Sequence, residues 1–320
     1  MTSDRKIRLA FWGTAPFAVP LLRSLALDAS FDIVAVVTRP DEPVGREQTL
    51  TPPAVKSAAI ELGLRVQQPE SLKDETWAQS YAKLKLDVAV VVAYGKLIPQ
   101  AILDVPKHQT LNVHPSLLPK YRGPSPIQAA ITNVDPETGI TIMLLDAEMD
   151  HGPLLAQKIV KMTGTETAPE LEARLADAAT SMLPDAVARY VAGDFVPTDQ
   201  DHSRATFTKI ITRDDGRIDW SKPAVLIERL FRAYQPWPGI WTEWKRAGRA
   251  MRLKLLSVAL EPSASTSPGT VLSDFIVACG SGGLKILRIQ PEGKKEMSAE
   301  EFLRGHPEIV NSRLDDQNPS

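Results

Sequence analysis

Three polar side chains near the middle of the chain have the residue types needed for acyl transfer. Asn112 and His114 stand two residues apart at the end of a predicted strand, 110–114, so their side chains point to the same face. Asp150 follows 36 residues after His114. An amide N–H and an imidazole N–H can stabilise an oxyanion, while a carboxylate beside the imidazole can set its tautomer and order a proton-relaying water. We therefore predict that these three residues act together in acyl transfer to an amine.

A proline-bounded loop follows directly after His114. The segment Pro115-Ser-Leu-Leu-Pro-Lys-Tyr-Arg-Gly123 is restrained by two prolines and ends in a glycine, and such a loop can offer backbone donors and acceptors to a planar ligand. Each signal alone has an ordinary structural interpretation, since a strand-end histidine is usually a surface or capping residue and an Asp before His-Gly is usually a turn residue. The combination of the three residues with this loop favours a functional site.

The sequence Asn112-Val-His-Pro-Ser-Leu-Leu-Pro119, with Asp150-x-Gly152 after it, resembles the enzymes that use 10-formyltetrahydrofolate as formyl donor. The resemblance implies that Asn112, His114 and Asp150 are the catalytic set, acting through a tetrahedral intermediate without a metal. It also implies that the folate lies against one loop and one further wall of the pocket, at Ser116, Leu117, Leu118, Pro119, Tyr94 and Gly95. For Tyr94 and Gly95 an ordinary strand-to-helix turn remains the alternative.

Other segments resemble the family members that formylate the methionine carried by initiator tRNA. The matching segments span nearly the whole chain: Phe11–Pro20, Val36–Arg46, Ile218–Trp220, Arg232–Gly239 and Gly293–Gly305. The resemblance implies that 10-formyltetrahydrofolate is the co-substrate, that initiator methionyl-tRNA is the partner, and that the insertion after the second strand reads the acceptor stem. Support for translation initiation follows from that reaction.

The predicted RNA contacts are less uniform than the predicted catalytic residues. The insertion is usually strongly basic in the family, whereas residues 39–50 carry two positive and three negative charges here, so Arg46 is the contact we expect from it. From Thr206 onward the chain has 17 Lys and Arg against 14 Asp and Glu. A basic cluster in this half includes Lys245, Arg246 and Arg249, and it is either a phosphate-contacting patch or a solvated hairpin face.

The elements that must position these residues are predicted from hydrophobic periodicity. Apolar strand-like runs alternate with helical patterns in the first half: strands 7–12, 33–37, 87–93, 110–114, 140–145 and 154–160, and helices 17–27, 53–62 and 170–191. This alternation predicts a doubly wound, mostly parallel α/β sheet of the Rossmann-like formyltransferase type. Later segments predict a helix over 224–232 and strands over 252–258, 269–272, 275–279 and 284–289. They suggest a small C-terminal β-barrel, OB-like in character.

The expected domains follow from the change between the alternating strands and helices of the first half and the short strands of the second. Residues 1–193 form the predicted catalytic domain, the polar stretch 194–205 the linker, and 206–320 a tRNA-binding β-barrel domain. A length of 320 residues is enough for two cores. The glycinamide-ribonucleotide members of the family are single-domain, so a second domain favours a macromolecular substrate.

Composition limits the remaining classes. Cys279 is the one cysteine, which excludes an internal disulfide and a multi-cysteine zinc site, and its apolar surroundings predict a buried residue. A net charge of −2 argues against a uniformly basic nucleic-acid coat, and no apolar run approaches the ~20 residues needed to span a bilayer. We expect a cytoplasmic monomer that binds neither DNA nor a membrane.

Three alternatives remain open. A formyltransferase acting on an amino-sugar nucleotide would share the catalytic set and is disfavoured by the C-terminal resemblance alone. A non-catalytic RNA- or folate-binding protein would not need Asn112, His114 and Asp150 together. A nicotinamide dehydrogenase is disfavoured because Gly13-Thr-Ala-Pro-Phe17 lacks the glycine pattern that lets a backbone approach a pyrophosphate.

Overall fold

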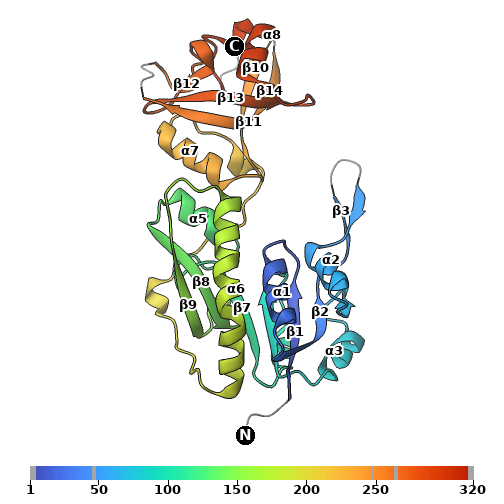
Figure 1. Cartoon of the computed structure of the whole chain (residues 1–320). Helices are drawn as coiled ribbons and strands as arrows, with labels where there is room; N and C mark the ends of the chain where they lie inside the picture. Colours follow the sequence, from blue (N-terminus) through green and yellow to red (C-terminus); the bar gives the residue numbers. More distant parts are fainter. Residues whose placement is uncertain (1–4, 45–47, 247, 263–265, 316–320) are drawn as a thin grey trace. The chain divides into compact units, whose positions relative to one another are not determined.

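The chain folds into two compact units. The computed structural model describes residues 5–44, 48–246, 248–262 and 266–315 (Figure 1). The first unit comprises Met1–Pro126, Pro136–Met162 and Leu171–Lys209, and the second comprises Ile127–Asp135, Thr163–Glu170 and Ile210–Ser320.

A seven-stranded sheet organises the first unit. Its strands follow the order β5-β2-β1-β6-β7-β8-β9. The first five are parallel to their neighbours, while β8 is antiparallel to both β7 and β9. The bounds are β1 Ile7–Gly13, β2 Phe31–Val37, β5 Val66–Gln67, β6 Val88–Val92, β7 Thr110–His114, β8 Glu137–Leu144 and β9 Leu154–Lys161. The predicted doubly wound, mostly parallel sheet is confirmed.

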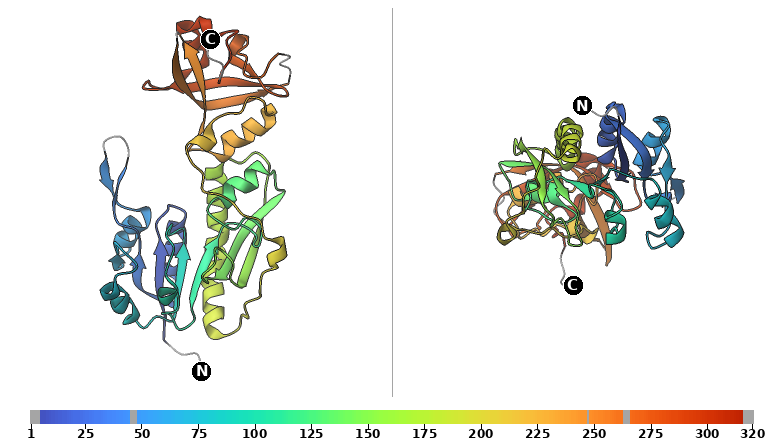
Figure 2. Two further views of the ribbon diagram at one scale, coloured as in Figure 1. Left: turned by 180° about the vertical axis from the view of Figure 1, so that it is seen from behind. Right: turned by 90° about the horizontal axis from the view of Figure 1, so that it is seen from below.

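Helices cover both faces of this sheet, which is why its central strands are apolar throughout. All five residues of β6 are buried. On β1, Ala10 and Trp12 belong to a core cluster with residues of α3 and α4, and Trp12 Nε1 donates to Tyr81 Oη over 2.9 Å. The helices α1 and α6 lie in front of the sheet in Figure 1 and behind its strands in Figure 2. Covering on both faces is what a parallel sheet requires.

The helices begin at residues that suit helix starts. An Asp74 carboxylate accepts from the backbone N–H groups of Thr76 and Trp77 at the start of α3, and Pro53 directly precedes α2. The bounds are α1 Ala18–Leu27, α2 Ala54–Glu61, α3 Glu75–Ala82, α4 Gln100–Leu103, α5 Pro126–Thr132 and α6 Ala168–Ala192. Among the described residues, no helix is long and apolar enough to cross a membrane.

The insertion after β2 is a two-stranded hairpin, β3 Glu42–Val44 with β4 Thr49–Thr51. Its base is tied down at Asp41, which accepts hydrogen bonds from Gln68 and Lys56. Those bonds lower the pKa of the Asp41 carboxyl below its usual value. The predicted contact Arg46 lies outside the described residues.

The second unit contains a curled antiparallel sheet with two helices from the C-terminal part of the chain, and most of α5 also belongs to it. Strands follow the order β10-β11-β13-β12, and β14 pairs with β13. The bounds are β10 Ile240–Arg246, β11 Arg249–Glu261, β12 Ile276–Ala278, β13 Gly283–Pro291, β14 Met297–Ser298, α7 Ala224–Ala233 and α8 Ala299–Gly305. Trp244, Phe275 and Phe302 are at the centre of its core. The predicted C-terminal β architecture is confirmed as a half-barrel.

One predicted strand of this unit is wrong. Residues 269–272 form isolated bridges through Thr270 and Val271 and no continuous strand, because Gly269 turns the chain with a φ of 87°. Conversely, β10 was not predicted: Ile240, Thr242 and Trp244 share one face of the strand, but Trp241 on the other face is buried as well.

Candidate active site

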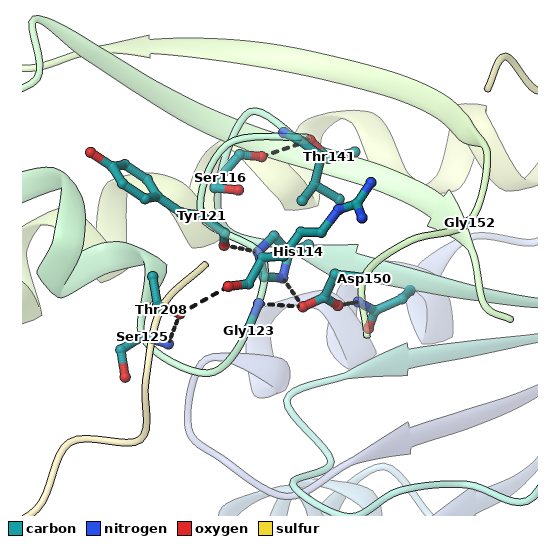
Figure 3. A network of polar contacts seen from close by, with 12 residues as sticks. His114, Ser116, Tyr121, Gly123, Ser125, Thr141, Asp150, Gly152 and Thr208 are labelled. Atoms are coloured by element: carbon teal, nitrogen blue, oxygen red, sulfur yellow. Dashed lines mark hydrogen bonds and ion pairs between the residues drawn. The ribbon is translucent and has the colours of Figure 1, made fainter. Parts of the chain in front are cut away.

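The carboxyl end of β7 brings the predicted catalytic residues together. β7 lies between β6 and β8, with Asn112 in register with Val91 on one side and Met143 on the other. His114, the last residue of the strand, is buried, and Asn112 is half-buried. Asp150 reaches the same place from the turn between β8 and β9 (Figure 3). The site therefore lies where ligands of open α/β sheets bind, outside the carboxyl ends of the strands.

The hydrogen bond of His114 defines which of its nitrogens carries a proton. Nε2 lies 2.9 Å from the carbonyl oxygen of Tyr121, and a carbonyl can only accept, so Nε2–H is the donor. Nδ1 lies 3.6 Å from Asp150 Oδ2. The tautomer is thus set by the Tyr121 carbonyl and not, as predicted from the sequence, by the Asp150 carboxylate. In the neutral imidazole Nδ1 is consequently left as the base.

Asp150 is held in an unusual backbone conformation with a fixed carboxylate. Its φ is 48°, in the left-handed region that few non-glycine residues adopt. Oδ2 accepts the backbone N–H of Gly123 over 2.7 Å, and Oδ1 accepts from Asn112 Nδ2 at the long distance of 3.5 Å. Two residues later, a Cβ on Gly152 would lie 2.1 Å from the carbonyl oxygen of Leu144, so this turn needs glycine there.

The loop after His114 is fastened to β8. Thr141 Oγ1 donates to the Ser116 carbonyl over 2.6 Å and accepts from the backbone N–H of Leu118 over 3.1 Å. The Ser116 hydroxyl donates to the carbonyl of Lys120 within the loop. Ser116 and Leu118 are buried, while Leu117 and Pro119 are half-buried. The loop is therefore rigid, and the Ser116 hydroxyl is already engaged within it.

The second predicted folate wall divides between core and surface. Tyr94 packs edge-on against Trp12 in the core. Burial raises the pKa of its hydroxyl, and the positive charge of Arg39 offsets only part of this rise. Its carbonyl accepts from Thr14 Oγ1 over 2.9 Å. Gly95 is exposed, with a φ of 79°. A ligand would meet this segment through its backbone rather than through the tyrosine ring.

Sequence reasoning missed the residues that brace the two turns. Gln200 is buried, and its Nε2 donates to the carbonyls of Asp150 and Gly152 over 2.9 and 2.8 Å. Its Oε1 accepts from Nε and Nη2 of the buried Arg122 over 3.2 and 2.7 Å. His202 Nδ1 lies 2.8 Å from Arg122 Nη2. No spacing signal could identify Gln200, because its partners are about fifty and eighty residues away and it lies in a polar stretch without periodicity.

Comparison with known proteins identifies the family. Two successive parts of the chain match family descriptions: residues 5–187 match "Formyl transferase" and residues 210–307 match "Formyl transferase, C-terminal domain". The chain belongs to the formyl transferase family. It is therefore an enzyme that transfers a one-carbon group, as the sequence resemblance implied.

Two relatives called methionyl-tRNA formyltransferase are similar to this chain over nearly its whole length. The methionyl-tRNA formyltransferase of Roseiflexus sp. (strain RS-1) is 43% identical over 97% of this chain and 96% of its own length. That of Chloroflexus aurantiacus (strain ATCC 29366 / DSM 635 / J-10-fl) is 44% identical over 93% of this chain and 97% of its own.

Solved structures at lower identity share the fold. The N-formyltransferase from Helicobacter canadensis, in complex with folinic acid and dTDP-3-aminofucose, is 18% identical and covers 89% of this chain and all of its own, with a TM-score of 0.65. HypX from Aquifex aeolicus in complex with tetrahydrofolic acid is 17% identical over 93% of this chain, with a TM-score of 0.62. The present chain spans about half the length of HypX, 47%.

The predicted tRNA contacts of the second unit lie at one hairpin. Arg246 ends β10 and is in register with Arg249, the first residue of β11, so both extend from the same face of the sheet. Lys245 lies on the opposite face. The Arg246 guanidinium is paired with Glu308, with Nε 2.7 Å from Oε1. The predicted cluster is therefore divided between two faces, and one of its members is already matched by a carboxylate.

Proposed function

We propose that this protein transfers the formyl group of 10-formyltetrahydrofolate to the α-amino group of methionine on initiator methionyl-tRNA. The observation that carries the proposal is the convergence of the Asn112 amide, the His114 imidazole and the Asp150 carboxylate at the end of β7. Relatives named methionyl-tRNA formyltransferase, similar over both units, support the choice of acceptor. Such a reaction would support translation initiation.

Two backbone segments would hold the folate co-substrate, whose formyl group is the one-carbon unit transferred. The rigid loop Ser116, Leu117, Leu118 and Pro119 offers one wall, and the backbone at Gly95, beside the core residue Tyr94, offers the other. Fixed loops suit a rigid, planar ring system because little conformational entropy is lost when the ligand binds. A neighbour solved with tetrahydrofolic acid and another with folinic acid support this class of co-substrate.

The proposed chemistry assigns a separate task to each polar group. The attacking amine must be neutral, and a reference α-amino pKa of roughly 7.7–8.0 means that only modest base assistance is needed near pH 7. His114 Nδ1 and the Asp150 carboxylate, which face each other, accept the proton that the amine loses as its nitrogen bonds to the formyl carbon. The Asn112 N–H and the imidazolium Nδ1–H then stabilise the oxyanion of the tetrahedral intermediate. Breaking of the old carbon–nitrogen bond returns the proton to the departing folate nitrogen.

The two parts of the chain would divide the work. We assign the chemistry to residues 1–193, and tRNA binding to residues 206–320 with the insertion at 39–50. Lys245, Arg246 and Arg249 would contact phosphates of the tRNA, and Arg46 would contact its acceptor stem. Phosphate contacts of this kind set affinity and register rather than chemistry.

The test is to incubate the protein with 10-formyltetrahydrofolate and charged initiator tRNA, and to ask whether the methionine gains a formyl group. Formylation within minutes at catalytic enzyme concentration is the expected result. A parallel reaction offers a nucleotide-linked amino sugar, because the Helicobacter canadensis enzyme, which was solved with one, shares the fold. Formylation of the sugar without formylation of the tRNA would overturn the proposed acceptor while leaving the proposed chemistry in place.

A further inference from the structure

The segment between α6 and Ile210 is hydrogen-bonded both to the start of β9, next to the turn that carries Asp150, and to the loop that follows His114. Its first anchor is a bridge between Leu154 and Thr198, with both backbone N–H···O distances below 3 Å. Its second runs beside loop 119–125: Arg122 N donates to Thr206 O over 2.8 Å, and Thr208 N donates to Arg122 O over 2.8 Å. The Thr208 hydroxyl also accepts from the backbone N–H of Ser125 (Figure 3). Gln200 lies between these two anchors.

We propose that Gln200 is the positioning residue of the Asp150 carboxylate. Its side-chain amide joins the Asp150–Gly152 turn to loop 121–123, and so fixes the carboxylate against His114 and Asn112. The inference rests on the proposed function for the roles of those three residues. Gln200 itself touches none of the reacting groups, because its bonds go to backbone carbonyls and to Arg122.

The amide of Gln200 is suited to this task because every polar atom it has is used. An amide offers two N–H donors and one oxygen with two acceptor sites. The two donors meet the carbonyls of Asp150 and Gly152, and the oxygen meets two N–H groups of Arg122. A flipped amide would set N–H against N–H and oxygen against oxygen at all four contacts. The Gln200 amide therefore has a single orientation in this network, and this orientation fixes the positions of both turns.

Both turns contain backbone conformations that need such external support. Asp150 has a φ of 48° and Tyr121 a φ of 62°, both in the left-handed region. Conformations of this kind persist at functional sites only where surrounding contacts over-determine them. Tyr121 supplies the carbonyl that fixes His114, and Gly123 supplies the N–H that fixes the carboxylate. Loss of the Gln200 hydrogen bonds would therefore let the Asp150 turn shift relative to the loop that holds the Tyr121 carbonyl and the Gly123 N–H.

Gln200→Glu is the sharpest variant. The new carboxylate keeps an acceptor for Arg122 and gains charge attraction, so the folded state should keep its melting temperature within a few degrees. The other carboxylate oxygen would face two carbonyl oxygens where the amide had donated to them, and the turn would be pushed away. Because a misplacement of ~1 Å can cost on the order of 10²-fold in rate, we expect kcat to fall ~30–100-fold while KM for folate and for tRNA changes by less than about threefold. Gln79→Glu, the same change on the exposed surface of α3, should leave all of these values unchanged.

A double-mutant cycle separates positioning from a general structural effect. In an Asp150→Asn background, measured by single turnover, Gln200→Glu should cost less than about threefold further, because the group it positions has already lost its charge. An undiminished ~30–100-fold further loss would overturn the proposal, as would an equal rise of both KM values in the single variant. Gln200→Met, similar in size and unable to donate, serves as the second variant. Failure of both variants to fold would assign Gln200 to fold stability and would also contradict the proposal.

Hydrogen exchange provides a readout that does not depend on the substrate. The backbone amide of Gly123 is protected through its bond to Asp150 Oδ2, so Gln200→Glu should speed its exchange at least ~10-fold while the amides of β6 remain protected. Unchanged protection at Gly123 would overturn the positioning role. This result can be obtained even if the wild-type protein fails to formylate methionyl-tRNA, so failure of the proposed function and failure of this inference are distinguishable.

Discussion

At the scale of single residues, the direction of each hydrogen bond decides what the candidate site can do. The Tyr121 carbonyl fixes Nε2 of His114 as a donor, which leaves Nδ1 facing the Asp150 carboxylate as the only ring nitrogen able to take a proton. The Gly123 N–H meets the Asp150 Oδ2 atom at 2.7 Å, closer than either of the two predicted partners. The carboxylate is thus placed mainly by the backbone of the loop, and in the proposed reaction His114 is the residue that exchanges the proton.

The first prediction concerns His114→Ala. Removing the imidazole removes both the base and the oxyanion donor, so we expect kcat for formyl transfer to fall at least ~10²–10⁴-fold, with folate and tRNA binding changed by less than about threefold. Rates would be measured by single turnover and binding by equilibrium titration. The matched control is His108→Ala, which removes a histidine just before the opposite end of β7 and should keep near wild-type activity. Turnover by His114→Ala at the wild-type rate would contradict the proposed role.

The sequence identified residues of the candidate site when they were close along one strand or one loop. Asn112 and His114 were accessible to prediction because a strand's alternation fixes their common face. The Tyr121 and Gly123 backbone groups were not, since the bonds they make depend on left-handed conformations that spacing does not encode. Gln200 was still less accessible, because only the folded chain brings residues 122, 150 and 200 together.

At the scale of elements, the turn between β8 and β9 is constrained by close backbone approach. A Cβ at position 152 would lie 2.1 Å from the Leu144 carbonyl oxygen, and the neighbouring backbone cannot yield without moving Asp150. We expect Gly152→Ala to lower the free energy of unfolding by ~1–3 kcal/mol and to reduce kcat at least tenfold. Urea denaturation and steady-state kinetics would check the two effects.

The control for this change is Gly305→Ala at the end of α8. A Cβ there has no atom within 4 Å, and alanine favours a helix, so stability should be unchanged or slightly raised. If Gly152→Ala proved as harmless as this control, the strict backbone requirement of the β8–β9 turn would be disproved.

Helices and strands were predicted most accurately where their own residues carry a clear hydrophobic pattern. The continuous apolar run of β6 and the long periodic helix α6 were predicted to within a few residues, since burial of a whole strand or one helical face leaves a clear pattern. β10 was missed because Ile240, Trp241 and Thr242 at its start are all buried, so the strand shows no clear alternation of apolar and polar residues. The antiparallel direction of β8 and β9 depends on chain reversals that periodicity does not specify.

At the scale of the whole molecule, one thiol links stability to alkaline pH. Burial in the core of the second unit raises the pKa of Cys279 to about 11, whereas an unfolded thiol titrates near ~8.5. Between these values the unfolded chain loses the proton and the folded chain keeps it, so stability must fall as pH rises. The largest possible loss is ~1.4 kcal/mol per pH unit over this window, or roughly 3 kcal/mol.

The effect of the thiol is measured by comparing the wild-type protein with Cys279→Ala, a variant that lacks the thiol but keeps the other titrating groups. The difference in unfolding free energy between wild type and variant should shift by ~2–3 kcal/mol against the wild type between pH 8 and pH 11. Urea titrations at four or five pH values would measure it. A difference that stays constant over this window would show that the thiol is not buried as described.

The proposed RNA surface of the second unit makes the last prediction, and it concerns charge rather than geometry. Among the described residues Arg249 has no carboxylate partner, whereas Arg246 is paired with Glu308. Releasing Arg246 for a phosphate costs its ion pair, so Arg249→Ala should weaken tRNA binding more than Arg246→Ala does. Each lost phosphate contact should reduce the slope of log affinity against log salt by about 0.7–1, without changing folate affinity. Lys83→Ala, at an exposed position after α3, should leave the slope unchanged. If Arg249→Ala kept the wild-type slope, this hairpin would be a solvated face and the tRNA contacts would have to lie elsewhere on the chain.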